Sequence, residues 1–273
     1  MNISEMKSVA ADSLSYFIHV MPNVPFTEDD VIIEFVPKMK MAEYARVLCK
    51  RYFLGKVISQ AQELSEMVDA NALIGRDKSA VICRINYKLS GQAWYRILFH
   101  QFMHIYCAKK EMDSEHFIDM YGSRTTLERP NVTPAEKTYD GLLVAGYTVW
   151  SEFIAQYYTL KYTDIKQYTV DQMSAYIKSL FNKVGRIDNK ENKYALSYAC
   201  ARLLTCSDAK DIVTTLQESN DEMPAEQRAF LSCLFLLYDH MKNEEPWIID
   251  EVFIADLGEK YIFFRVNHML TRK

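Results

Sequence analysis

Residues 94–106 read WYRILFHQFMHIY and place two histidines, His100 and His104, four positions apart in an apolar segment. In an α-helix, a spacing of four puts both side chains on the same face, one turn apart. Two imidazoles arranged in this way can bind one Zn²⁺ ion. Between them stands Gln101, at the place where zinc peptidases of the His-Glu-x-x-His kind carry a glutamate general base. The segment therefore predicts metal ligands without the usual base.

The sequence before this segment favours a metal site. A strand-like run at residues 81–89, VICRINYKL, is followed by a Ser90-Gly91 break and then by the apolar helix. An alternating run at residues 31–36 ends at Pro37, which is typical of an edge strand. The alternative, that both histidines are hydrogen-bonded core residues, stays open.

A catalytic zinc ion usually has three protein ligands and one water, so a third ligand is needed. The best candidate is Glu152 in the apolar run GYTVWSEFIAQY, because an ionised carboxylate in such a helix needs a compensating cation. A buried Arg or Lys would compensate it too, and this alternative also stays open. Further candidates for the third ligand share a nitrogen, oxygen or sulfur donor: Cys107, Glu115, His116, Asp119 and Asp140. Of these, Cys107 reads more simply as a small core residue.

The combination resembles a gluzincin, and most closely the cytosolic metallopeptidases of the ImmA/IrrE type. The resemblance covers about residues 30–160 and includes Glu152 followed by Ala155, similar to that family's Glu-x-x-Ala. It implies that His100, His104 and Glu152 bind Zn²⁺, with Gln101 at the general-base position and a peptide or protein as substrate. The chain departs from the family in Gln101 and in the 48-residue spacing from His104 to Glu152, which is longer than in the compact members.

Two further side chains are candidates for stabilising an oxyanion. His116 lies in a polar segment, where a mobile imidazole could reach a substrate, and Tyr147 offers a hydroxyl near Glu152 in the sequence. The alternatives are that His116 is a solvated loop residue and that Tyr147 is an ordinary core residue, since the chain has 18 tyrosines.

Gln101 determines which chemistry is expected. A carboxylate can take up and deliver a proton, whereas an amide can only form hydrogen bonds. The sequence thus predicts a zinc-dependent peptidase in a form without its base, expected to bind metal and peptide with little turnover. The alternative is a natural pseudoprotease that serves as a zinc-containing module for binding peptides or proteins. Gln101 fits either this natural protein or a Glu-to-Gln change introduced into an active peptidase.

The composition indicates an ordinary globular protein. The chain has 273 residues, of which 49% are hydrophobic, and a net charge of −4. This balance gives no electrostatic footprint for nucleic acid or for an anionic membrane, so neither is expected as a partner. The N-terminal helix lacks the features of a secretory signal, and the six cysteines show no Cys-x-x-Cys pair. We therefore expect reduced thiols and a cytoplasmic location.

The expected fold class is α+β and mostly helical. A zincin-like domain with a small antiparallel or mixed sheet is predicted for residues 1–165, and a helical subdomain packed on it for residues 166–273. Hydrophobic periodicity predicts helices at residues 3–20, 41–69 with a break near Gly55, 169–184, 191–206, 208–219 and 225–242. Residues 109–137 are expected to form a surface loop. Residues 247–264 suit either a strand or a buried helix.

Overall fold

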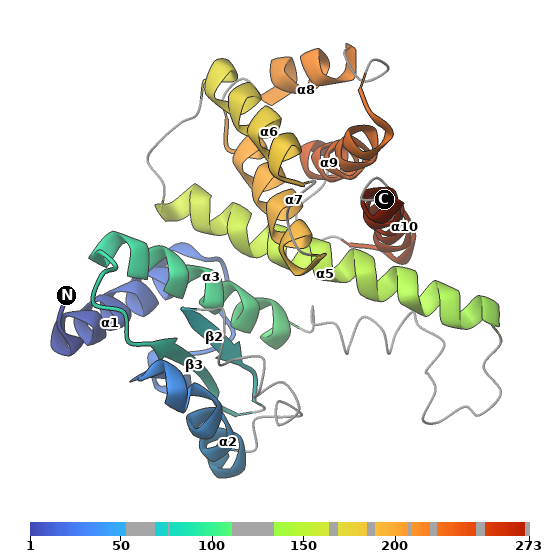
Figure 1. Ribbon diagram of the computed structural model, residues 1–273. Helices are drawn as coiled ribbons and strands as arrows, with labels where there is room; N and C mark the ends of the chain where they lie inside the picture. Colours follow the sequence, from blue (N-terminus) through green and yellow to red (C-terminus); the bar gives the residue numbers. More distant parts are fainter. Residues whose placement is uncertain are drawn as a thin grey trace. The chain divides into compact units, whose positions relative to one another are not determined.

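The computed structural model describes residues 1–52, 69–75, 77–110, 134–163, 169–184, 189–206, 209–218, 223–243 and 249–270. The chain consists of two compact units, Met1–Asp113 and Ser114–Lys273. The described part of the first contains a small mixed sheet with the helices α1 to α3, and the described part of the second is helical. The predicted α+β, mostly helical class is confirmed (Figure 1). The expected domain boundary after residue 165 stays a prediction.

The sheet of the first unit has the strand order β1-β3-β2. β1 (Val31–Val36) runs parallel to β3 (Ser79–Arg84), and β2 (Ala70–Leu73) runs antiparallel to it. Val81 in the central strand pairs with Ile33 on one side and with Ala72 on the other. β3 is buried along nearly its whole length, which explains its continuous apolar sequence. β1 is an edge strand, as its closing proline predicts.

Helices cover both faces of this sheet. α1 (Ile3–Val20) and α3 (Gly91–Lys109) pack together on one face, where Phe17 contacts Phe99 edge to face at 4.8 Å and Phe35 contacts Trp94 at 5.2 Å. α2 (Met41–Tyr52) covers the other face, where Met41 and Leu48 pack in a hydrophobic cluster with Leu73 and Ile82 of the sheet. Two short 3₁₀ helices, Glu28–Asp30 and Lys38–Lys40, flank β1. α3 therefore packs against both α1 and the sheet.

The second unit is built around α5 (Pro134–Thr163), which packs against α7 and α10. Trp150 and Phe153 of α5 are fully buried, and the Ser197 hydroxyl of α7 donates a hydrogen bond to the Val149 carbonyl at 3.0 Å. Gly146 and Gly258 lie where the backbones of α5 and α10 approach each other most tightly. The remaining helices are α6 (Val170–Val184), α7 (Asn189–Leu204), α8 (Ala209–Glu218), α9 (Ala225–Asn243) and α10 (Glu251–Leu270).

Four predicted elements need correction or completion. The strand expected to run to residue 89 ends at Arg84, because the Asn86 side chain accepts a hydrogen bond from the Lys88 N–H and turns the chain. Residues 70–73, for which no element was predicted, form the strand β2. α5 begins at Pro134, inside the expected loop. The ambiguous C-terminal stretch is helical from Glu251. The predicted break near Gly55 and most of the 109–137 loop lie outside the described residues.

Two general features accompany this fold. All six cysteines are buried as free thiols. Among the helices that the structure describes, none combines the length and apolarity needed to cross a membrane.

Candidate metal centre

α3 owes its position to its sequence. The Ser90 side chain caps the helix by accepting a hydrogen bond from the Ala93 N–H at 3.2 Å, and the helix continues to Lys109. Most of its apolar side chains are buried, including Trp94, Leu98 and Phe102 at 0% exposure. A helix that is apolar on nearly all sides is enclosed by its surroundings. The polar residues that remain on α3 therefore sit in a partly desolvated environment.

The two histidines of α3 converge on one point. His100 is buried, at 8% exposure, and His104 is half-buried one turn further on. Their Nε2 atoms are 3.1 Å apart, and the rings meet at 80° with centroids 4.8 Å apart. This separation suits one N–H···N hydrogen bond between neutral imidazoles, and equally two lone pairs directed at one ion. Two nitrogens bound tetrahedrally to zinc at about 2.0–2.1 Å would lie roughly 3.3 Å apart. The Nε2–Nε2 distance is therefore close to that of two ligands of one zinc ion.

Gln101, between the histidines, is anchored to the sheet. Its Oε1 atom accepts a hydrogen bond from the backbone N–H of Ala72 at 2.8 Å. Ala72 belongs to β2, an edge strand, so this contact joins α3 to the rim of the sheet. Because the carbonyl oxygen faces β2, the NH₂ group is the remaining polar end of the side chain, and it can only donate.

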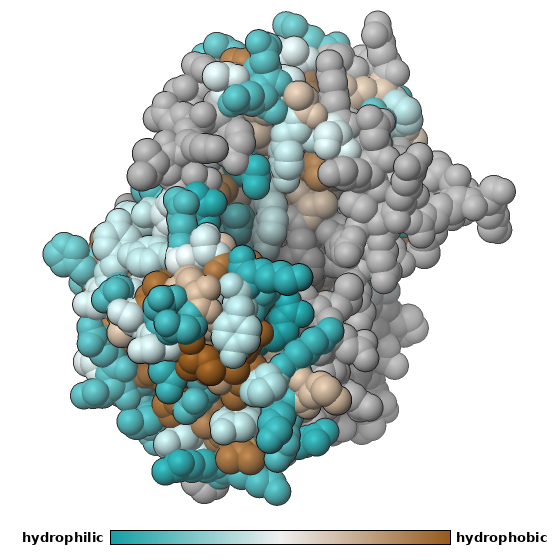
Figure 2. Space-filling view, turned by 60° about the vertical axis from the view of Figure 1, so that its left-hand side comes forward, coloured by the Kyte–Doolittle hydropathy of each residue, from teal (hydrophilic) through white to brown (hydrophobic). Residues whose placement is uncertain are grey.

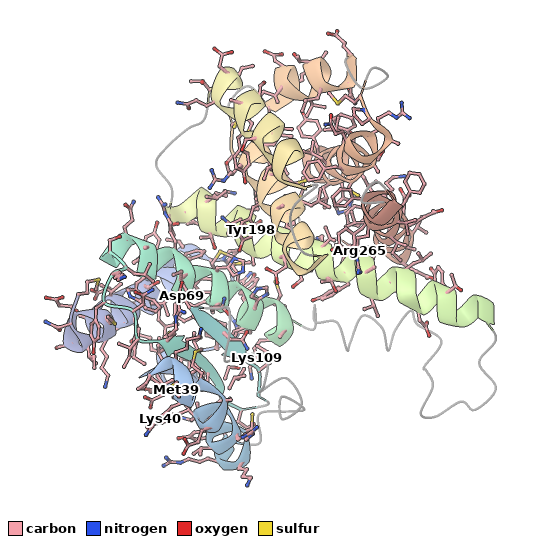
Figure 3. The ribbon with its side chains drawn as sticks, viewed as in Figure 1. Met39, Lys40, Asp69, Lys109, Tyr198 and Arg265 are labelled. Carbon is pink, nitrogen blue, oxygen red and sulfur yellow. The ribbon has the colours of Figure 1, made fainter. Side chains whose placement is uncertain are left out.

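Two more contacts fix the same rim of the sheet (Figure 3). Lys109 at the end of α3 donates from Nζ to the Gly75 carbonyl at 2.6 Å. Asp69, just before β2, accepts hydrogen bonds from Nε and Nη2 of Arg84 and from Nδ2 of Asn86. Together these contacts hold β2 against β3 and α3, and with it the backbone group that orients Gln101.

Glu152 lies on α5 in the second unit. It is half-buried, whereas Trp150, Phe153, Ile154 and Ala155 around it in the sequence are buried. The apolar setting that singled out this acid in the sequence is therefore confirmed. The role of Glu152 as the third ligand beside His100 and His104 stays a prediction.

The other candidate residues have different outcomes. Tyr147 is buried on α5, with its ring 5.6 Å from that of Trp150, and its role as an oxyanion stabiliser stays a prediction. Asp140 is also buried on α5. Burial raises the pKa of Cys107 to about 12, so this thiol stays protonated at neutral pH, as expected of a core residue. The predictions for His116, Glu115 and Asp119 fall outside the described residues.

Sequence reasoning missed the partner of Gln101. Residues 70–73 read ANAL, which carries no strand signal, so nothing in the sequence pointed to Ala72 as a neighbour of the base position. Comparison with protein-family models, with curated proteins and with solved structures gives no match. The resemblance to the ImmA/IrrE-type peptidases thus rests on the sequence motif, and the candidate metal site on the geometry of the histidine pair.

Proposed function

We propose that His100, His104 and Glu152 bind Zn²⁺ and that the chain is a zinc-peptidase scaffold which, with Gln101, binds peptide with little hydrolysis. The observation that carries the proposal is the convergence of the two Nε2 atoms at 3.1 Å on one face of α3. Zinc in such a site acts as a Lewis acid toward a carbonyl oxygen. The carboxylate of Glu152 would complete a His₂Glu ligand set, which is common for catalytic zinc.

The role of Gln101 follows from its hydrogen bond. With Oε1 held by the Ala72 N–H, the NH₂ donor is the group of Gln101 that is left to contact a bound peptide. A donor in this place can bind and orient a carbonyl or carboxylate oxygen, but it cannot accept a proton. General acid–base catalysis is typically worth about 10² to 10⁴ in rate, so hydrolysis by this form is expected to be slow.

The anchoring of Gln101 also supports a second candidate function, a natural binding module. A side chain fixed by a backbone hydrogen bond has a structural role whether or not catalysis occurs. In this case the chain would hold a peptide carbonyl between the metal site and the Gln101 amide, without cleavage.

Substitution Gln101→Glu separates the two functions. A glutamate can keep the hydrogen bond from Ala72 through one oxygen and offers the second oxygen as a proton acceptor, so α3 should stay in place. We expect zinc-dependent cleavage of a diverse peptide library, read by mass spectrometry, to rise by about 10² or more over the Gln101 form and to be abolished by a chelator. Gln101→Met is the matched control, since it has a similar length and no proton acceptor.

The peptidase proposal fails if the glutamate variant is folded and holds zinc but shows no chelator-sensitive cleavage beyond that of the methionine control. The binding module would then be the better account. Zinc-dependent retention of the same peptides by the Gln101 form would support it.

A further inference from the structure

Among the described strands, none pairs with the outer edge of β1. In the described part of the chain, β1 has a strand neighbour on one side only. The Val36 carbonyl accepts a hydrogen bond from the Ile85 N–H at 2.9 Å and so faces β3. Because backbone groups alternate along a strand, Ile33 and Phe35 direct their N–H and C=O groups toward the outer edge. An edge of this kind is a template for another extended chain.

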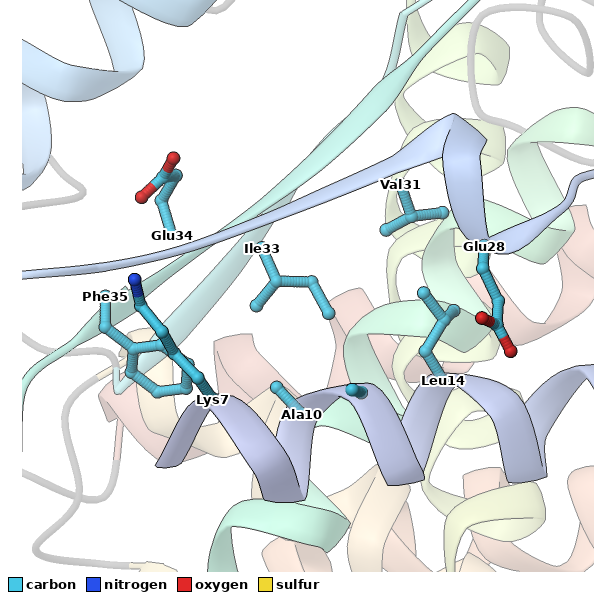
Figure 4. Close-up of a pocket in the computed structure, with 9 residues that line it drawn as sticks. Lys7, Ala10, Leu14, Glu28, Val31, Ile33, Glu34 and Phe35 are labelled. Carbon is cyan, nitrogen blue, oxygen red and sulfur yellow. The ribbon is translucent and has the colours of Figure 1, made fainter. Parts of the chain in front are cut away.

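A pocket of about 330 Å³ lies beside this edge, between α1 and β1 (Figure 4). Its middle is apolar, because Ala10 and Leu14 of α1 and Val31 and Ile33 of β1 line it. On the α1 side its ends carry opposite charges: Lys7 extends beside Phe35 at one end, and Glu28 lies near Leu14 at the other. Glu34 also lines the Lys7 end, but its carboxylate points to the side of the strand away from α1. Apolar residues also gather among hydrophilic ones on the face of the first unit shown in Figure 2.

We propose that this pocket and edge are the contact surface between two copies of the chain, whose β1 strands pair antiparallel with Ile33 opposite Ile33. The two three-stranded sheets would then form one continuous sheet, order β2-β3-β1-β1-β3-β2. In this register, Val31 of one copy faces Phe35 of the other. Side chains of directly opposite residues point to the same face, so both fall on the α1 side, where the pocket has room for them.

The charges around the pocket favour a second copy of the chain as the partner, and they favour the register with Ile33 opposite Ile33. A two-fold contact needs a surface that is complementary to itself. Antiparallel pairing meets this condition, because it brings Lys7 of each copy, at the Phe35 end, to Glu28 of the other, at the Val31 end. Of the two neighbouring registers, one would place Glu34 directly opposite Glu34 of the second copy, and like charges in that position are destabilising. The other, centred on Ile32, would pair only residues 31–33 of each strand.

The test measures self-association of the full chain by sedimentation velocity over a concentration series. We expect a reversible monomer–dimer equilibrium. Lys7→Glu and Glu28→Lys should each weaken the dimer by roughly tenfold, since each replaces two attractive pairs by two repulsive ones. The double variant should restore the affinity, because it exchanges the charges. Lys50→Glu, an exposed lysine of α2 on the other face of the sheet, is the matched control and should leave the affinity unchanged.

Ile33→Pro provides a second test, since it removes an outward N–H and leaves the ladder between β1 and β3 intact; it should abolish the dimer. Circular dichroism checks that the variant is folded. Two results would overturn the proposal. One is a chain that remains monomeric at its highest soluble concentration. The other is a dimer that is not weakened by Lys7→Glu, by Glu28→Lys or by Ile33→Pro. If the chain stays monomeric, an extended peptide of another protein would be the remaining candidate for pairing with the β1 edge.

Discussion

Replacing Gly146 by alanine should destabilise the second unit, although alanine is the better helix former. A Cβ atom at position 146 would run into the backbone carbonyl oxygen of Ile254, and one at Gly258 would run into that of Leu142. These oxygens belong to the backbones of α10 and α5 and cannot rotate away as a side chain could. The two helices would have to separate along their shared interface.

Two opposing contributions determine how much Gly146→Ala changes the free energy of unfolding. Alanine is favoured over glycine inside a helix by about 1 kcal/mol. Overpacking a close contact costs about 1–3 kcal/mol and occasionally more, and a collision with backbone belongs at the upper end. We therefore expect Gly146→Ala to lower the free energy of unfolding by roughly 2 kcal/mol.

Urea unfolding followed by circular dichroism would measure this change, and hydrogen exchange would show whether it is confined to α5 and α10. Gly141→Ala is the matched control. It lies on the same helix, it is exposed, and an added Cβ meets no described atom within 4 Å. The control should gain up to about 1 kcal/mol. The reasoning is refuted if Gly146→Ala proves as stable as Gly141→Ala.

Two further predictions concern the first unit. Burial raises the pKa of Cys107 from 9.0 to about 12, so the folded state holds this proton more tightly; its contribution to stability is complete below pH 9 and is lost as the pH rises toward 12. The urea midpoint should fall over this range, and Cys107→Ala should flatten the fall; an unchanged slope would contradict the prediction. Asp69→Ala should cost about 1 kcal/mol, because three side-chain hydrogen bonds are lost at a partly exposed site. Asp77→Ala, at an exposed position, is its control. Equal urea midpoints for the two variants would contradict the prediction that Asp69 stabilises the fold through Arg84 and Asn86.

The sequence predicted the elements whose hydrophobic pattern matches the way they pack in the structure. α1 and the helices α6 to α9 have apolar stripes and clear ends, so their bounds lie within about two residues of those expected. The edge strand β1 was evident from alternation and the closing proline. At the site, helical spacing alone was enough to bring His100 and His104 together.

The remaining features depend on contacts that no local pattern contains. β2 consists of alanine, asparagine and leucine, and it is a strand because β3 and α3 hold it. α10 is apolar on more than one side because it packs against both α5 and α9, so periodicity could not separate strand from helix. The bond between Gln101 and Ala72 depends on the same tertiary packing.

The most direct test of the metal centre is the zinc content of the purified chain after loading and dialysis, measured by elemental analysis. We predict about one zinc per chain, with clear loss in both His100→Ala and His104→Ala, because each removes one of two converging ligands. His19→Ala, an exposed histidine of α1, is the matched control and should keep its zinc. Glu152→Gln should weaken zinc affinity at least about tenfold. Undiminished zinc in both His100→Ala and His104→Ala would contradict the account.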